Sequence, residues 1–204
     1  MGGWEPHIPK STEKKFLGEF IIDSLYGISS KLFTEGKFPV LRMNNLDILG
    51  NWHLQDLKYT NENLTESRLL KYGDFLFNRT NSLDLVGKCG VINFDFNGTW
   101  AGYLIRLRFN EKLNPFFLRY LFAQKEYRDY FRSIAKPAGG QANINLQELA
   151  QTKIDYFTPE IQRKIIKELD KEMQALEKVK MLKEKAEKRI EEILEEVWGE
   201  KEKR

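Results

Sequence analysis

The clearest pattern of apolar and polar positions lies between Glu160 and Trp198, where apolar residues recur at alternating steps of three and four residues. This spacing is typical of the seam of a coiled coil, in which a stripe on one long helix packs against another helix. The stretch contains neither glycine nor proline, and Gly199 supplies a C-terminal stop. At 1.5 Å per residue the helix would be roughly 58 Å long. We therefore expect it to need a partner.

The predicted seam consists of two series of positions seven residues apart, each with one charged member. Its residues are Ile165, Leu169, Glu172, Leu176, Val179, Lys183, Ala186 and Ile190. In an antiparallel pair of identical helices, one register sets Glu172 opposite Lys183 and apolar residues opposite one another. Sliding by one heptad leaves both charges facing apolar residues, which is unfavourable. The charges therefore favour this register, although both side chains could instead be solvated, with Met173 and Leu182 turned into the seam.

Shorter and mixed patterns fill the residues before this helix. The clearest strand is Tyr103 to Phe109, whose alternation places Arg106 and Arg108 on one face. A short apolar strand is expected after the turn at Gly73 and Asp74. Further strands are expected at residues 38–43, 52–59, 86–96 and 154–157, whereas residues 1–15 are polar and partly disordered in this interpretation.

One core helix is expected from Asn114 to about Ala135, because Asn114 is a favourable N-cap and Pro115 suits the first helical position. Residues 136–145 cannot continue it, since Pro137 and two glycines break helical geometry. A helical turn at residues 146–150 follows. The expected fold class is α+β: a mixed globular domain over residues 1–158 (the front domain), a coiled-coil helix over 159–199 and a charged tail over 200–204.

Composition narrows the possible functions. The net charge of +3 lies in the front domain, because the helix and tail are charge-balanced; this permits a polyanion partner without requiring one. The lone Cys89 with His7 and His53 cannot form a zinc cluster. We find no phosphate-binding loop, cofactor loop or catalytic set of residues, so we expect no enzymatic activity and no cofactor. Without a signal peptide or an apolar span, the cytoplasm is the expected compartment.

Polar side chains gather in three clusters at strand ends and in a loop. The candidate DNA-binding residues are Arg42, Asn44, Asn45, Asn78, Arg79, Thr80, Asn81, Ser82, Lys88, Lys136, Gln141, Asn143 and Asn145. Asn and Gln can pair with adenine and Arg with guanine, while Ser and Thr can contact bases or phosphates. The alternative is that these residues only form turns.

The order of several short motifs carries a resemblance to a known family. In sequence they are Leu17-Gly18-Glu19, residues 36–46 (GKFPVLRMNNL), residues 73–79 (GDFLFNR), Val86-Gly87-Lys88, residues 140–145 (GQANIN) and Phe157-Thr158-Pro159 before the long helix. This order resembles the specificity subunit of type I restriction-modification systems. The resemblance covers nearly the whole chain.

The resemblance implies a non-catalytic subunit whose target recognition domain reads half of a split site in double-stranded DNA. It also implies that the helix spaces two such domains and docks DNA methyltransferase subunits, with restriction subunits as further partners. The family's usual subunit holds two recognition domains and two helices, whereas this sequence has one of each, so a homodimer is expected. The alternative function is a coiled-coil protein-interaction adaptor that does not read DNA.

Overall fold

The computed structural model describes residues 13–198, in which the chain divides into two compact units between Arg163 and Lys164. The first unit holds every strand of this range, and the second is the continuation of one helix, α4 (Pro159–Trp198). The stretch predicted to be a long helix is therefore confirmed from Pro159 onward. Gly199, the tail over 200–204, His7 and most of the segment predicted to be disordered lie outside the described residues.

The main sheet of the front domain has four antiparallel strands in the order β2 (Ile21–Tyr26), β9 (Leu104–Phe109), β5 (Phe75–Asn78) and β7 (Cys89–Val91). All four residues of β5 are buried, so this central strand is covered on both faces. Strand β9 confirms the expected alternation, since Arg106 and Arg108 both reach Asp23 on β2.

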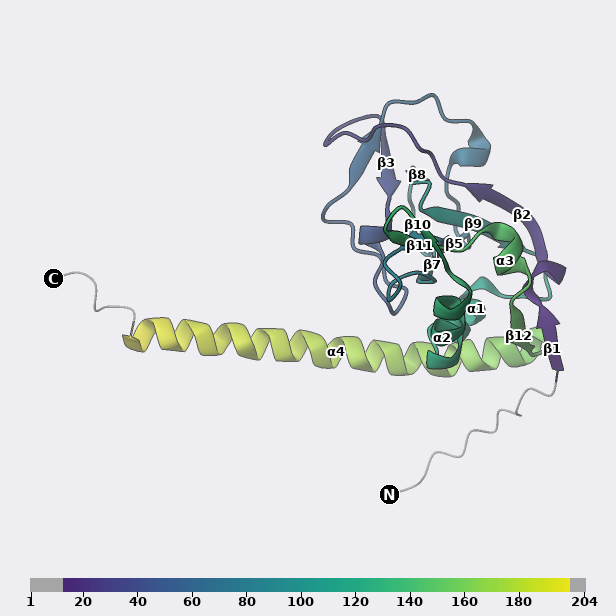
Figure 1. Ribbon diagram of the computed structural model, residues 1–204. Helices are drawn as coiled ribbons and strands as arrows, with labels where there is room; N and C mark the ends of the chain where they lie inside the picture. The colour runs from purple at the N-terminus through teal and green to yellow at the C-terminus, as the bar shows by residue number, and fades with distance from the viewer. Residues whose placement is uncertain (1–12, 199–204) are drawn as a thin grey trace, which may run out of the picture. The chain divides into compact units, whose positions relative to one another are not determined.

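Helices α1 (Pro115–Phe122) and α2 (Lys125–Ile134) cover one face of this sheet (Figure 1). The ring of Phe77 lies 6.3 Å from Phe122 and 5.1 Å from Phe131, both edge to face. Edge-to-face pairs add about 0.5–1.5 kcal/mol each beyond their buried area. These aromatic contacts attach the two helices to the sheet.

The prediction of a single helix from Asn114 to Ala135 is wrong in one respect: the backbone is extended at Gln124, and a second helix starts there. Phe122 and Tyr127 explain the break. In one continuous helix they would point about 140° apart, yet their rings lie 5.5 Å apart and Phe122 also packs on Phe131. The start is confirmed: Asn114 Oδ1 accepts a hydrogen bond from the Phe116 amide, and Pro115 follows the cap.

A second sheet has the order β4 (Lys58–Thr60), β3 (Phe38–Leu41) and β8 (Thr99–Trp100), with β3 and β8 parallel. Between it and the main sheet lies a core of Leu41, Leu70, Leu76, Ile92, Trp100 and Leu104. Leu76 therefore packs in this core, while its neighbours Phe75 and Phe77 face the helices. The continuous apolar run in β5 follows from this two-sided burial.

Two smaller sheets complete the domain. Strand β1 (Glu13–Phe16) pairs with β12 (Lys153–Tyr156), so the predicted disorder is wrong for residues 13–15. Strands β10 (Lys136–Ala138), β11 (Gln141–Asn143) and β6 (Thr80–Asn81) form an antiparallel three-stranded sheet, called the hairpin sheet below. A short helix, α3 (Leu146–Ala150), follows it as expected.

Three expected strands are shorter than the sequence indicates. Strand β3 ends at Leu41 because Met43–Asn45 turns as a 3-10 helix, and only β7 forms within residues 86–96. Within 52–59, Trp52 makes only an isolated bridge to Leu46 and its Nε1 donates to the Val91 carbonyl, so regular pairing begins at Lys58. Further 3-10 turns lie at Leu17–Glu19 and Glu66–Arg68.

Candidate functional site

The hairpin sheet brings together two of the three predicted polar clusters. Residues of the second cluster form β6, and residues of the third form β11, with Asn143 opposite Thr80. Thr80 Oγ1 donates a 2.9 Å hydrogen bond to Asn143 Oδ1. Two segments far apart in the sequence therefore present their polar side chains on one small sheet.

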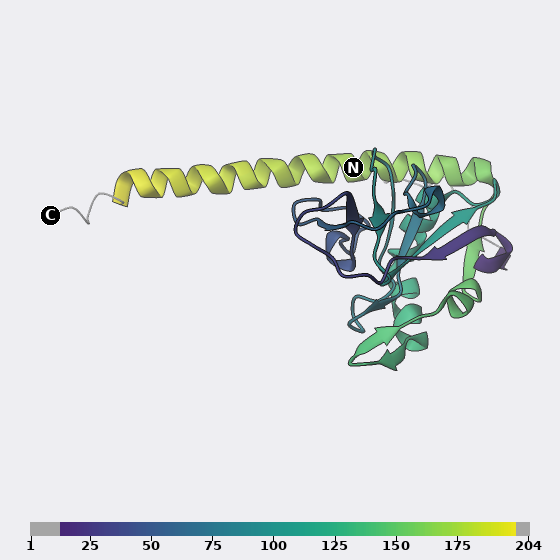
Figure 2. The same ribbon diagram turned by 90° about the horizontal axis from the view of Figure 1, so that it is seen from above.

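The β10–β11 hairpin carries the most accessible part of this sheet and lies at the margin of the front domain (Figure 2). Its turn is made by Gly139 and Gly140, at φ angles of +57° and +80°, and these conformations favour glycine. A Cβ on either glycine would have no atom within 4 Å, so a side chain at either position would point into open space. Gln141 is half-buried, and the exposed Lys136 pairs with Glu148.

Within the second cluster, Asn78 and Asn81 hold the main chain. Asn78 is fully buried and donates to the carbonyls of Thr80 and Tyr103, while Asn81 donates to Asn78 Oδ1 at 2.7 Å. Buried amides with their partners already satisfied cannot turn to a base edge without losing those bonds. The prediction that these two residues contact DNA is therefore corrected: they shape the junction of β5 and β6.

The first cluster lies in a separate loop that several hydrogen bonds hold together. Buried Asn45 accepts from the Arg42 amide and donates to the carbonyls of His53 and Asp56, and the Arg42 guanidinium pairs with Asp56 at 2.8 Å. The prediction for Asn45 is corrected to this structural role. Asn44 is exposed beside it.

Lys88 also has a structural role rather than the predicted one. Its ammonium is buried and donates to the carbonyls of Met43 at 2.9 Å and Leu46 at 2.6 Å. Burial lowers the pKa of Lys88 from its ordinary value, against the opposing effect of Asp47. The side chain fastens the loop of the first cluster to β7 and is not available to a ligand.

Asn145 is the N-cap of α3. Its Oδ1 accepts from the Glu148 amide at 2.8 Å, and Glu148 accepts from the Asn145 amide in return. This capping box gives Asn145 a structural role that does not involve a ligand. The candidates that are not buried and have no such structural role are Arg42, Asn44, Arg79, Thr80, Ser82, Lys136, Gln141 and Asn143.

Arg79 differs from Arg106 and Arg108, the two arginines of strand β9. Its guanidinium lies over the Tyr26 ring, 5.0 Å from the centroid, and within the described residues no carboxylate pairs with it. By contrast, Arg106 and Arg108 pair with Asp23 and Asp74. A pocket opens beside Arg79 and includes Ser29, a residue that no motif in the sequence indicated.

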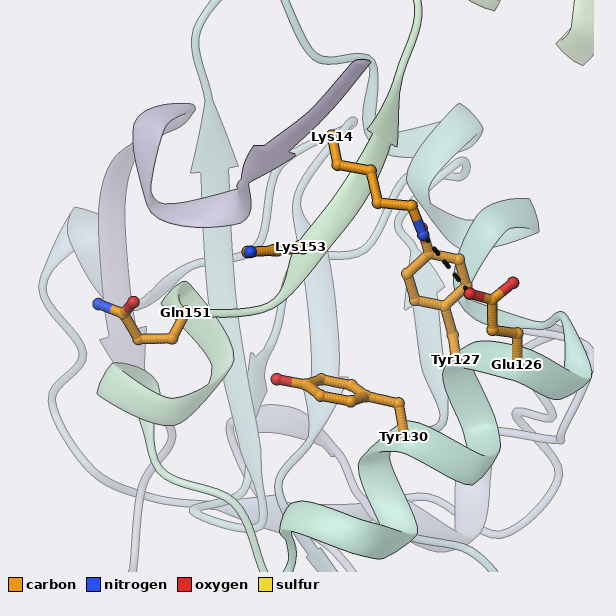
Figure 3. Close-up of a pocket in the computed structure, with 6 residues that line it drawn as sticks. All are labelled: Lys14, Glu126, Tyr127, Tyr130, Gln151 and Lys153. Carbon is orange, nitrogen blue, oxygen red and sulfur yellow. Dashed lines mark ion pairs between the residues drawn. The ribbon is translucent and has the colours of Figure 1, made fainter. Parts of the chain in front are cut away.

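A second pocket, of about 380 Å³, lies between β1, α2 and β12 (Figure 3). It contains Lys14, Lys153 and Tyr130, but the Lys14 ammonium points to Glu126 at 3.5 Å and also lies 3.7 Å from Asp155. A carboxylate in the lining offsets part of the positive charge. Its lining of two lysines and one glutamate therefore carries no more net positive charge than the lining beside Arg79, where no carboxylate opposes the arginine.

The described residues include neither a metal-binding group nor a reactive thiol. Residues 13–198 contain no group of His, Cys, Asp and Glu side chains that could hold a metal ion. Burial raises the pKa of Cys89 to about 12, so its thiol stays protonated and unreactive at neutral pH. No helix in the same range is long and apolar enough to cross a membrane.

Helix α4 presents its apolar stripe to solvent in the single chain. Leu176, Val179 and Ile190 are 43%, 61% and 57% exposed. Lys183 pairs within the helix with Glu187, at 3.5 Å, and Glu172 is exposed. An apolar stripe along several turns of an exposed helix indicates a binding surface for another helix.

Comparison with known proteins relates this chain to one group. A family model described as the type I restriction modification DNA specificity domain matches residues 9–188. The chain is 29% identical over 168 residues, 78% of its length, to a protein of Methanocaldococcus jannaschii named as the MjaX type I restriction enzyme specificity subunit.

Two solved structures share the fold. One is the type I restriction-modification S subunit of M. genitalium, at a TM-score of 0.60 and 17% identity over 98% of this chain. The other comes from a study of assembly and conformational transition of the type I R-M system, at a TM-score of 0.64 and 22% identity over 92%. The chain spans 39% of the curated relative and 48% and 46% of these two chains.

Proposed function

The chain belongs to the type I restriction modification DNA specificity domain family, and on that premise we propose that its front domain reads the base sequence of double-stranded DNA. The observation that carries the proposal is the hairpin sheet, where Thr80, Gln141 and Asn143 lie together on a narrow projecting element. A two-stranded β-ribbon fits the major groove, and Gln and Asn side chains match the donor and acceptor pattern of adenine. The domain acts by binding and has no catalytic role.

We further propose that α4 docks DNA methyltransferase subunits and pairs with a second copy of itself in antiparallel orientation. Its exposed apolar stripe supports a helical partner, and its charges at Glu172 and Lys183 support the antiparallel register with these residues opposite one another. A restriction subunit would join the complex through the methyltransferase. We also propose that the front domain spans residues 1–158 and that the coiled-coil helix spans residues 159–199.

An antiparallel dimer makes the target a split palindrome. A twofold axis relates the two reading domains, so the half-sites must be inverted copies, and we expect them about one helical turn apart, roughly 34 Å. Copurification from the native cell with methylation mapping of its DNA tests both proposals. The expected result is a copurifying methyltransferase and a methylated palindrome that disappears when this chain is deleted. An asymmetric site dependent on this chain alone would contradict the dimer.

One observation favours a second function. The exposed stripe on α4 requires a protein partner whether or not the front domain binds DNA, so the chain could be a protein-interaction adaptor. Binding to duplex DNA measured across salt concentrations separates the two functions. Phosphate contacts give a linear fall of log affinity with log salt, whereas an adaptor shows no such binding.

A further inference from the structure

The pocket beside Arg79 has the features of an anion site. We propose that it holds one phosphate group of the DNA backbone and so fixes the position of the β10–β11 hairpin on the duplex. This inference rests on the proposed function, since it assigns a part of the same DNA-binding surface. It also gives Arg79 a different role from the base contact expected from its residue type.

The lining of the pocket supplies hydroxyl groups and one positive charge. The pocket has a volume of about 410 Å³, and its lining includes four residues with hydroxyl groups, Ser29, Ser30, Thr80 and Tyr103, of which Thr80 already donates its hydrogen to Asn143. Arg79 is the only charged residue among its described lining residues, which include no carboxylate. Hydroxyl donors around an unopposed guanidinium suit an oxyanion rather than a cation or an apolar group.

Arg79 is held in place from three directions before any ligand arrives. Its amide donates to the Tyr103 carbonyl and its carbonyl accepts from the Ile144 amide, both at 2.9 Å. Its guanidinium stacks on Tyr26, whose hydroxyl accepts from the Leu146 amide at 3.1 Å. A guanidinium fixed in this way loses little conformational entropy when it binds an anion.

Two polar atoms of residues that line this pocket lack partners. Arg79 Nε and Ser30 Oγ are buried, and neither has a hydrogen-bond partner in the described structure. Leaving a buried donor unpaired costs roughly 1–3 kcal/mol. An oxyanion in the pocket offers several acceptor oxygens to a guanidinium and to a neighbouring hydroxyl, so it could relieve that cost.

The shape of the site favours a phosphate over a base. Base edges lie within the grooves and are reached by projecting elements such as the hairpin, whereas phosphates stand out from the duplex and can enter a recess. Thr80 lines the pocket and also bonds Asn143 on the hairpin. A phosphate bound here would therefore be at a fixed place relative to the residues that read bases.

The test is the salt dependence of binding to a duplex of arbitrary sequence, because a phosphate contact does not depend on sequence. The full chain is measured alone and with the methyltransferase subunits that copurify with it. We expect Arg79→Ala to weaken binding on the order of tenfold, equally for different sequences, and to reduce the log-log salt slope by about 0.9. Arg79→Lys keeps the charge, so it should keep the slope.

Three further variants keep the test independent of folding defects at Arg79. Ser29→Asp places a carboxylate in the lining at an exposed position, and we expect it to weaken DNA binding as Arg79→Ala does, while Ser133→Asp on the exposed surface of α2 does not. Arg119→Ala is the matched arginine control. Arg119 also stacks on a tyrosine, Tyr120, and has an unpartnered Nε, but it lines a different pocket.

The outcomes are distinguishable. If the wild-type chain shows no salt-dependent DNA binding in either form, the proposed function fails. If it binds with a steep slope that Arg79→Ala and Ser29→Asp leave unchanged, the phosphate site is wrong and the function stands. A change in base preference at one position without a change in slope would show a base contact instead. Stabilisation of the wild type but not of Arg79→Ala by inorganic phosphate, with unchanged DNA slopes, would indicate a site for the free anion.

Discussion

Thr80 and Asn143 are 63 positions apart in the chain and are joined by a 2.9 Å side-chain hydrogen bond between β6 and β11. This bond fastens the projecting hairpin to the junction that follows the central strand β5. Polar clusters from distant stretches of the sequence are thereby brought together on one surface.

The first prediction concerns the strength of this link. We expect Thr80→Val and Asn143→Ala each to lower the free energy of unfolding, with a coupling between them of about 1 kcal/mol, because each removes one partner of the same bond. Urea denaturation of the wild type, both single variants and the double variant measures the coupling. Strict additivity would show that the bond does not stabilise the hairpin sheet.

The second prediction concerns base recognition by Gln141. It lies on β11, next to the open Gly139-Gly140 turn, where a projecting amide can reach a base edge. We expect Gln141→Ala to lose about 1–3 kcal/mol of discrimination at a specific base pair. Selection of bound sequences from a random duplex library, or methylation mapping of cells carrying the variant, gives the measurement.

The control for Gln141 is Gln151→Ala, which removes an exposed amide outside the hairpin sheet. It should leave the selected sequence unchanged. If Gln141→Ala selects the wild-type motif with the same stringency, Gln141 is a turn-flanking residue without a reading role.

The third prediction concerns the register of the α4 pair. Glu172→Lys or Lys183→Glu alone should weaken the dimer because each sets like charges against one another, and the double swap should restore it, with a coupling of about 1 kcal/mol. Lys183 must leave its intrahelical partner Glu187 to meet Glu172, which limits the gain. Sedimentation equilibrium gives the dissociation constants.

Crosslinking checks the same register independently. With Cys89→Ser as background, Leu176→Cys and Val179→Cys chains mixed together should form a disulfide, since the register places these positions opposite each other. Lys171→Glu, a charge change outside the seam, serves as the control for the charge swaps. Additive single changes, or no crosslink, would rule out this alignment.

The fourth prediction concerns acid stability and Asp47. Burial tends to raise the pKa of Asp47, but hydrogen bonds from Asn51, His53 and the Leu49 amide outweigh it and hold the pKa below its ordinary value. A depressed folded-state pKa stabilises the fold above the unfolded-state pKa, and this stability is lost as pH falls through the folded-state value. The window is therefore below about pH 4.

We expect Asp47→Asn to cost about 1 kcal/mol at pH 7, reduced by the partial exposure of the group, and less at pH 3. Urea midpoints at both pH values give the comparison, with Asp95→Asn at an exposed position as the control. An equal cost at pH 7 and pH 3 would show that the charge of Asp47 does not contribute.

Local patterns in the sequence are sufficient to predict those helices and strands whose position depends on interactions between residues close together in the chain. The seam spacing predicts α4, alternation predicts β9 with Arg106 and Arg108 on one face, and Asn114 with Pro115 predicts the start of α1. Each depends on residues within a few positions of one another. The break at Gln124 is different, since it follows from aromatic packing that no local pattern records.

The site was only partly predictable for the same reason. Residue type selected Thr80, Gln141 and Asn143 as candidates, but it could not separate them from Asn78, which has similar chemistry and is fully buried. Whether a polar side chain faces solvent or bonds the main chain depends on long-range pairing such as that of β6 with β11. The pocket beside Arg79 also needs Ser29 and Ser30, which lie in a segment without a recognisable motif.

The pairing of β1 with β12 has a consequence for how such a domain can be reused. Glu13 lies opposite Tyr156, so the chain enters the front domain and leaves it at neighbouring points of one two-stranded ribbon. A module with adjacent entry and exit can be exchanged, duplicated or inserted into another protein without rebuilding its interior. Recombination at this ribbon could therefore give a new DNA specificity in one step while the helical scaffold is inherited unchanged.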